Sequence, residues 1–368
     1  MLEKNIDTPL PFVEKISRRH RRGTLAGFAL LLAAQPIAIY GADILYNYQV
    51  EAESSVDIDI RGEAIDESNN NSALIFFNGF GTNNASVPVK YVGPAMQDII
   101  DGQLWSVDYG NAPLNAVDIT RHILEEAEKQ NVTRVSLIGY SAGGIIAIEV
   151  AEQLTAESSL SIELITAIST PDGIDGLQQD KQEEMSLTET IALIPGATHS
   201  THLRYVGEMF ARQEQFTQGT AIDNITDFNR ISNHVLTALK DNRLPQTWLL
   251  VDQALAIANA DLSSDISSVR SNTRTTRPLP VMLYLSSPGS GMVNDSLSAE
   301  SICNYAAQNS IECYTYEAPG AIHSRIDLGE ESYNEALAQA KHVIINALER
   351  AKDKAAITNG SSTSSKVQ

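Results

Sequence analysis

Cysteine is scarce in this sequence, whose 368 residues hold only Cys303 and Cys313. Two cysteines are too few for a disulfide-built scaffold or for a zinc site made of thiolates alone. They lie in neighbouring predicted elements and could bridge in an oxidising compartment, but two unpaired buried thiols fit the sequence equally well. The cysteines therefore leave the redox state of the compartment open.

Basic residues are few relative to acidic ones. Lys and Arg number 26 against 46 Asp and Glu, so the formal net charge is −20. A surface of this charge repels phosphate backbones, which argues against nucleic acid as a partner. The exception is the basic N-terminus, residues 1–22, where six basic side chains stand against three acidic ones.

Charge is absent altogether from the twenty residues 23–42. A helix of that length is about 30 Å long, which matches the hydrocarbon core of a bilayer. The segment lacks a clean A-x-A cleavage site, which favours an uncleaved transmembrane signal anchor over a signal peptide. With the basic residues in the cytoplasm, the positive-inside rule puts the remaining chain on the extracytoplasmic side of the membrane. If the segment is cleaved, the protein is secreted.

Apolar strands alternate with amphipathic helices along most of the remaining chain. Strands are expected at 46–50, 56–60, 73–77, 104–109, 135–138, 162–168, 280–285 and 311–316. Helices are expected at 94–100, 116–129, 145–154, 297–307 and 331–351. This alternation predicts the α/β class, with a mostly parallel sheet that carries helices on both faces.

One long stretch, residues 172–278, interrupts the alternation with helical periodicity and no convincing strand. It predicts an inserted helical cap, and the sheet domain then comprises residues 43–171 and 279–353. The clearest helices of this cap are expected at 231–239 and 249–262. The end of the chain, 354–368, is rich in serine and is predicted to be a disordered tail.

The motif that points to chemistry is Gly139-Tyr140-Ser141-Ala142-Gly143, which fits G-x-S-x-G between an apolar strand and an apolar-periodic helix. This context is typical of a nucleophile elbow, a tight turn that exposes a serine hydroxyl. The two glycines relieve the crowding of such a turn. The turn also puts the Ala142 N–H at a helix N-terminus, where it can bind a developing oxyanion. The alternative is a structural serine in a glycine-rich turn.

A nucleophilic serine needs a base, and the base needs an acid that orients it. Of the seven histidines only His323 lies in a loop directly after a strand, at the edge of the sheet where the serine turn opens. His323 is therefore the predicted base. Asp295, in the loop after the strand 280–285, is the predicted acid, and Asp172, just past 162–168, is the alternative acid. Either aspartate could instead be a helix N-cap.

The loop after the strand 73–77, Asn78-Gly79-Phe80-Gly81, resembles the oxyanion loop of the α/β-hydrolase superfamily. Members of that superfamily carry H-G-x-x or H-G-G-G at this point, and Asn78 stands where they have histidine. The order Ser141, Asp295, His323 also resembles the superfamily. The resemblance extends over about residues 45–350 and implies the Phe80 N–H as the second oxyanion donor, beside that of Ala142.

This resemblance implies a serine hydrolase, similar to esterases and lipases, that cleaves a carboxylic ester through a covalent acyl-enzyme. It implies no metal and no organic cofactor, and its substrate is a small-molecule acyl ester or a lipid. An acyltransferase, a peptidase or a thioesterase would use the same residues, and an inert binding protein on this fold is a further alternative. His199 and His202 are spaced as in some metal sites, but no acidic third ligand is evident, which favours a surface pair.

Overall fold

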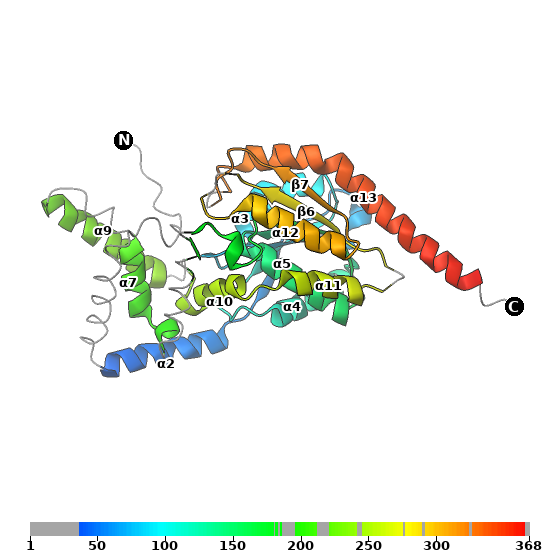
Figure 1. Ribbon diagram of the computed structural model, residues 1–368. Coiled ribbons are helices and arrows are strands. Elements are labelled where there is room, and N and C mark those ends of the chain that lie inside the picture. The colour runs from blue at the N-terminus through cyan, green and yellow to red at the C-terminus, as the bar shows by residue number, and fades with distance from the viewer. Residues whose placement is uncertain are drawn as a thin grey trace.

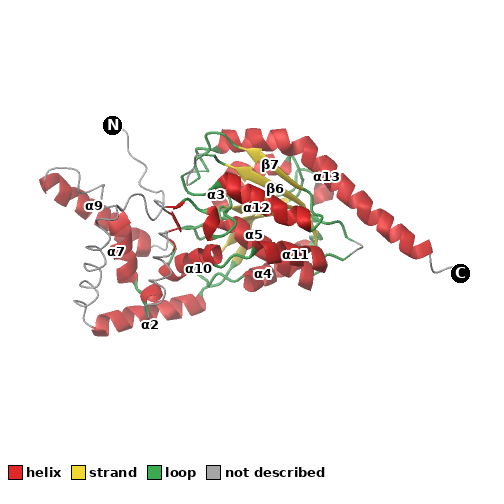
Figure 2. Ribbon diagram, in the orientation of Figure 1, coloured by secondary structure: helices red, strands yellow, loops and turns green. Residues whose placement is uncertain are grey.

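The computed structural model describes residues 37–364 apart from 180, 183–184, 186–195, 212–220, 241–244, 275–276, 289–290 and 324–325. A seven-stranded sheet lies at its centre, between two layers of helices (Figures 1 and 2). The strands are β1 (Asp57–Gly62), β2 (Ser72–Phe77), β3 (Gln103–Asp108), β4 (Arg134–Tyr140), β5 (Ser161–Ile168), β6 (Val281–Ser286) and β7 (Cys313–Glu317). The predicted α/β class is confirmed.

The strands follow the spatial order β1-β3-β2-β4-β5-β6-β7. Only β1 and β3 pair in antiparallel fashion, and all other neighbours are parallel. The carboxyl ends of the parallel strands therefore meet at one edge of the sheet, where sites of such folds form. The register pairs Phe77 with Gly139, which brings the loop after β2 beside the turn after β4.

The two faces of the sheet are covered by different helices. Helices α3 (Ser86–Gln97) and α13 (Glu330–Ser364) cover one face, and α4 (Ala116–Gln130), α5 (Ala142–Glu157), α11 (Leu262–Asn272) and α12 (Asp295–Gln308) cover the other. Strand β2 shows why, since all six of its residues are buried and successive side chains point to opposite faces. Leu74 and Phe76 pack toward α3 and α13, whereas Ile75 and Phe77 pack toward α5.

The described helices between β5 and β6 divide into two groups. Helices α10 (Thr247–Ala258) and α11 contribute Trp248, Ile257 and Ile266 to the same core as the sheet. Helices α7 (Thr201–Ala211) and α9 (Ala221–Lys240) bury Met209 and Val235 in a small cluster of their own. Figure 1 shows α7 and α9 at one side of the molecule, beyond the sheet layer. Within the predicted insertion, α11 thus takes an ordinary place on the sheet face.

The chain before β1 is helical, so the strand predicted at 46–50 is wrong. Helix α2 runs from Ile37 to Glu53, and β1 pairs with β3 instead of with this segment. The helix is held by contacts of Asp43, Asn47 and Glu51 with residues near His199, and such distant partners leave no trace in a local pattern. Residues 23–36 of the predicted membrane segment lie outside the described residues. No helix in the described part of the chain is long and apolar enough to cross a membrane.

The C-terminal region differs from the prediction at the end of its last helix, and it contains a disulfide between the two cysteines. Helix α13 continues to Ser364, so residues 354–364 are helical rather than a disordered tail. Cys303 of α12 and Cys313 of β7 form a disulfide, with their Cα atoms 5.3 Å apart. The bond ties the edge strand of the sheet to the helix that precedes it.

Candidate active site

Ser141 lies between the last residue of β4 and the first residue of α5. Its backbone has φ 56° and ψ −129°, a region that non-glycine residues rarely adopt. The conformation is held in part by the Ser141 N–H, which donates to the carbonyl of Ile168 at 2.8 Å. Strain of this kind costs of order 1–3 kcal/mol and persists where the surrounding structure imposes it. The turn has the conformation of a nucleophile elbow.

The glycines around Ser141 are required by the closeness of neighbouring backbone. A Cβ on Gly139 would clash with the backbone of Gly143 and Gly144, and a Cβ on Gly143 would clash with the carbonyl of Phe77. A Cβ on Gly144 would overlap the side chain of Thr170. The crowding predicted from the spacing of the motif is therefore observed, and it fixes α5 directly against the ends of β2 and β5.

His323 is the one predicted partner that the structure places against Ser141. Its Nε2 lies 2.8 Å from the Ser141 Oγ, across a sequence separation of 182 residues. It comes from the loop between β7 and α13 and is 5% exposed. When the hydroxyl donates in this contact, Nε2 accepts and the imidazole proton sits on Nδ1. The pair thus has the geometry of a nucleophile and its general base.

Burial controls the charge of this histidine. It lowers the pKa of His323 from 6.5 to about 4, because the imidazolium loses its hydration there. His323 is therefore neutral at neutral pH and free to accept a proton. No described residue accepts a hydrogen bond from its Nδ1.

Asp295, the predicted acid, does not contact His323. It is the first residue of α12, and its Oδ1 accepts a hydrogen bond from the Tyr284 hydroxyl at 3.0 Å. Its Oδ2 accepts one from the Ser287 N–H at 3.3 Å. Burial raises the pKa of the Asp295 carboxyl, while these donors act in the opposite direction. Both oxygens are engaged by groups of β6 and the residue that follows it, so the role of Asp295 as the orienting acid stays a prediction.

Asp172, the alternative acid, is engaged elsewhere too. Its Oδ1 accepts a hydrogen bond from the Ser298 hydroxyl at 3.3 Å, and its backbone N–H donates to the Ser298 Oγ at 3.3 Å. Ser298 lies on α12 and is fully buried. Asp172 therefore fastens the loop after β5 to α12, and no contact joins it to His323.

Ala142 and Phe80, whose backbone N–H groups are the predicted oxyanion donors, lie on the two chain segments that meet at Ser141. Ala142 is the first residue of α5, and Phe80 follows Gly79 in the loop after β2. Neither N–H donates to a described residue. A Cβ on Gly79 would lie 2.6 Å from the Ser141 Cβ and 3.2 Å from its Oγ, which shows how closely the loop approaches the serine. The loop that carries Phe80 thus lies against the serine, and the role of both N–H groups as oxyanion donors stays a prediction.

Two side chains shape the oxyanion loop. Asn78 donates from Nδ2 to the Asn84 carbonyl and accepts the Gly79 N–H at Oδ1, at 2.9 Å each. Gln253 of α10 is completely buried; its Oε1 accepts the Gly81 N–H and its Nε2 donates to the Thr82 carbonyl. Asn78 therefore has a structural role at the position compared above with the histidine of an H-G-x-x motif. The role of Gln253 was not predicted, since only the packing of α10 reveals it.

The other features that drew attention in the sequence lie apart from Ser141. His199 Nε2 is 2.7 Å from Glu51, and His202 Nδ1 is 3.1 Å from Asp43, so each histidine pairs with its own carboxylate of α2. The His199 ring also stacks between Tyr48 and Trp248 and is buried rather than on the surface. The described residues contain no cluster of the kind that holds a metal ion.

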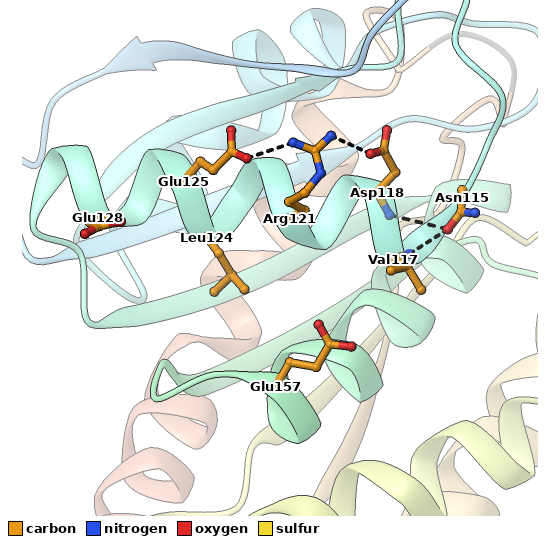
Figure 3. A pocket seen from close by; sticks show the side chains of 8 residues that line it. All are labelled: Asn115, Val117, Asp118, Arg121, Leu124, Glu125, Glu128 and Glu157. Atoms are coloured by element: carbon orange, nitrogen blue, oxygen red, sulfur yellow. Dashed lines mark hydrogen bonds and ion pairs between the residues drawn. The ribbon is translucent and has the colours of Figure 1, made fainter.

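A groove of about 530 Å³ lies on the outer surface of α4, and one wall comes from the end of α5 (Figure 3). Three of its charged side chains bind one another: Arg121 contacts Asp118 at 2.6 Å and Glu125 at 2.7 Å. Asn115 at its end caps the first turn of α4. None of its lining residues belongs to the Ser141 site, and its polar groups are those of an ordinary solvated helix face.

No protein-family model matches the chain, and no curated protein sequence matches it. Solved structures do resemble it. A carboxylesterase of the thaumarchaeon Nitrososphaera gargenis has 11% identity and a TM-score of 0.48 over 79% of this chain and 95% of that one. A homoserine O-acetyltransferase of Staphylococcus aureus has 13% identity and a TM-score of 0.45 over 78% and 95%. A lipase-esterase related protein of Clostridium acetobutylicum has 14% identity and a TM-score of 0.43 over 76% and 98%.

These likenesses are too distant to carry an argument about activity. The sheet and the site define the fold on their own terms. A mostly parallel sheet with helices on both faces, a strained serine turn between a strand and a helix, and a histidine after the last strand make up the α/β-hydrolase fold. The fold alone does not determine the activity, which depends on Ser141 and its surroundings.

Proposed function

We propose that the protein is a serine hydrolase that cleaves a carboxylic ester through a covalent acyl-enzyme at Ser141. One observation carries the proposal: the Ser141 Oγ stands on a strained elbow, 2.8 Å from the Nε2 of a buried, neutral histidine. A serine that only stabilised the turn would not need the imidazole beside it. The α/β-hydrolase fold supports a hydrolase, and the ester is our own inference.

In the proposed reaction, the Ser141 Oγ attacks the ester carbonyl carbon and its proton passes to the His323 Nε2. The carbonyl oxygen of the tetrahedral intermediate takes the negative charge and accepts hydrogen bonds from the N–H groups of Ala142 and Phe80. His323 then returns the proton to the leaving alkoxide, which departs as an alcohol. A water molecule attacks the acyl-enzyme in the same way, releases the acid and restores the serine.

Each step draws on a group that the site supports. The lowered pKa of His323 keeps the base neutral before the reaction, and the burial that lowers it also excludes competing water. The N-terminus of α5 adds the positive end of a helix dipole to the Ala142 N–H. Asp295 is given no step here, because both of its oxygens are engaged by Tyr284 and Ser287.

The test is the loss of Ser141 in the full-length protein. Ser141→Ala should abolish labelling by a fluorophosphonate and lower kcat on p-nitrophenyl esters by about 10⁴-fold or more. The matched control is Ser136→Ala, which removes the same atom from a completely buried position of β4, the strand that precedes Ser141. Its labelling and turnover should equal those of the wild type. Turnover that survives Ser141→Ala would end the hydrolase proposal.

The same assay defines the substrate. A panel of p-nitrophenyl esters of increasing acyl length separates small-ester esterases from enzymes that act on lipids. Adding an alcohol as competing acceptor separates hydrolysis from acyl transfer, since an acyltransferase would form a new ester instead of the free acid. Activity confined to amides or thioesters would replace the ester in the proposal and leave the Ser141 mechanism in place.

We also propose that the catalytic domain lies outside the cytoplasm, anchored through residues 23–42. The disulfide between Cys303 and Cys313 supports this, because such bonds persist in oxidising compartments. Protease added to intact spheroplasts should degrade the domain while it spares residues before Gly23. A cytoplasmic reporter that stays active when fused after Gln368 would contradict this topology.

A further inference from the structure

Tyr140, the residue before the nucleophile, occupies a position that the mechanism above does not use. As the last residue of β4 it points, like Ile138 two residues earlier, to the face of the sheet that α3 and α13 cover. The loop that carries His323 contributes Ala318, Ala321 and Ile326 to that same face. Strand geometry therefore puts the Tyr140 side chain directly under the loop of the base.

Tyr140 contacts His323 in two ways. Its hydroxyl donates a hydrogen bond to the main-chain carbonyl of His323. Its ring stacks near the imidazole, with centroids 5.6 Å apart and planes inclined by 29°. Both residues are buried, so neither contact is shared with solvent. One tyrosine thus restrains the backbone of His323 and one side of its ring.

No carboxylate in the described part of the chain holds the imidazole of His323 at Nδ1. Among the residues that the structure describes, none accepts a hydrogen bond from the His323 Nδ1, and the oxygens of Asp295 accept from Tyr284 and Ser287. A hydrogen bond from Nδ1 to a carboxylate is what normally fixes the imidazole of a serine hydrolase. The Nε2 nevertheless lies 2.8 Å from the serine, so something else must hold it there.

The Tyr140 hydroxyl is suited to be a permanent donor. Burial raises the pKa of Tyr140 well above 10, and the nearby Tyr333 and Asp295 act in the same direction. The hydroxyl therefore keeps its proton at neutral pH. It can hold the carbonyl of His323 but has no tendency to compete for the proton of the serine.

We propose that Tyr140 is a positioning residue for the base: its hydroxyl and ring hold His323 in register with Ser141 in place of a carboxylate at Nδ1. This inference rests on the proposed function, since it concerns the same reaction. It makes the second residue of the G-x-S-x-G motif part of the machinery. It also ties the base to the strand that carries the nucleophile, so the two move as one unit.

The experiment compares Tyr140→Phe with Tyr333→Phe in the full-length protein. Tyr140→Phe keeps the ring but leaves the buried carbonyl of His323 without a donor, so kcat should fall about tenfold while KM stays within twofold. Fluorophosphonate labelling should slow by a similar factor yet reach completion. Tyr333 is completely buried beside Tyr140, and its hydroxyl lies near those of Tyr140, Ser169 and Ser287 but makes no hydrogen bond to His323. Tyr333→Phe should therefore leave kcat within twofold of the wild type.

The pH profile gives a readout that a merely structural tyrosine would not move. A loosened His323 becomes hydrated, so in Tyr140→Phe the acid midpoint of kcat/KM should rise from near 4 toward 6.5. An unchanged kcat and midpoint in Tyr140→Phe, or an equal fall in Tyr333→Phe, would overturn the inference. Failure of the proposed function is distinct from this, because there Ser141→Ala would keep its turnover and the wild type would not be labelled.

Discussion

The proposed hydrolase activity is expected to persist well below the pH at which a histidine of ordinary pKa becomes protonated and stops acting as a base. His323 is 5% exposed, and burial lowers its pKa from 6.5 to about 4. The base must be neutral to accept the Ser141 proton, so activity is present above this pKa and is lost below it. The acid limb of kcat/KM, which reports the free enzyme, should have its midpoint near pH 4.

The lowered pKa of His323 changes the activity most at pH values between about 4 and 6.5. At pH 5.5 an imidazole with a pKa of 6.5 is only about 9% neutral, whereas one with a pKa of about 4 is about 97% neutral. Activity at pH 5.5 should therefore stay within about 10% of its value at pH 7.5, about tenfold above that of an unperturbed base. The assay is kcat/KM for a soluble ester between pH 3.5 and 8 at constant ionic strength, with circular dichroism at each pH.

A midpoint between pH 6 and 7 would refute this reasoning. A carboxylate near Nδ1 would stabilise the imidazolium and raise the pKa of His323. The profile therefore also reports whether Asp295 reaches the base in solution. The result does not depend on the substrate, provided that the chemical steps limit kcat/KM.

Stability offers an independent measurement of the same group. The unfolded imidazole takes up a proton below about 6.5, and the folded one only below about 4, so the unfolded state binds more protons between these values. The free energy of unfolding should therefore fall as the pH drops from 7 to 4, by up to about 3 kcal/mol from this group. His323→Gln should remove that part of the pH dependence in urea titrations. An unchanged dependence would show that the imidazole titrates normally.

Three further outcomes are expected. Gly79→Ala should lower kcat by about 100-fold or more without unfolding the protein, because its Cβ would lie 2.6 Å from the Ser141 Cβ; a kcat within twofold of the wild type would speak against this. Asp295→Asn and Asp172→Asn should each change kcat/KM by less than about tenfold, and a loss of several orders of magnitude in either would identify it as the orienting acid. Replacing Cys303 and Cys313 together by alanine should lower the free energy of unfolding by about 3 kcal/mol, given their separation of 10 residues, and no change in urea denaturation would show that the bond does not form in the cell.

The parts of the site that the sequence predicts are those whose chemistry is local. The elbow can be predicted because the strand, the G-x-S-x-G motif and the helix follow one another directly in the sequence. The crowding of Gly139 against Gly143 likewise involves residues that are only four positions apart. His323 can be found because the carboxyl ends of parallel strands meet at one edge. The sheet itself follows from the alternation of buried runs with amphipathic helices, and apart from 46–50 these runs lie within a few residues of the observed strands.

What escaped prediction depends on side chains that meet only after packing. The packing of α12 against β6 decides whether Asp295 contacts His323 or Tyr284. The position of Asp295 in the sequence, after the strand, is compatible with both contacts. Gln253 and Tyr140 act through contacts 172 and 183 residues away. For α2, the alternation of Tyr46, Tyr48 and Val50 suggested a strand, and distant partners turned it into a helix.

Helix α2 also has a consequence for the order in which the chain takes shape. Its residues Glu51 and Asp43 bind His199 and His202, which are 148 and 159 positions further along. A ribosome adds about 5–20 residues per second, so these histidines emerge roughly 7 to 30 s after the helix does. An isolated helix of 17 residues is only marginally stable in water. The first helix to leave the ribosome among those described is thus expected to be among the last to take its final place.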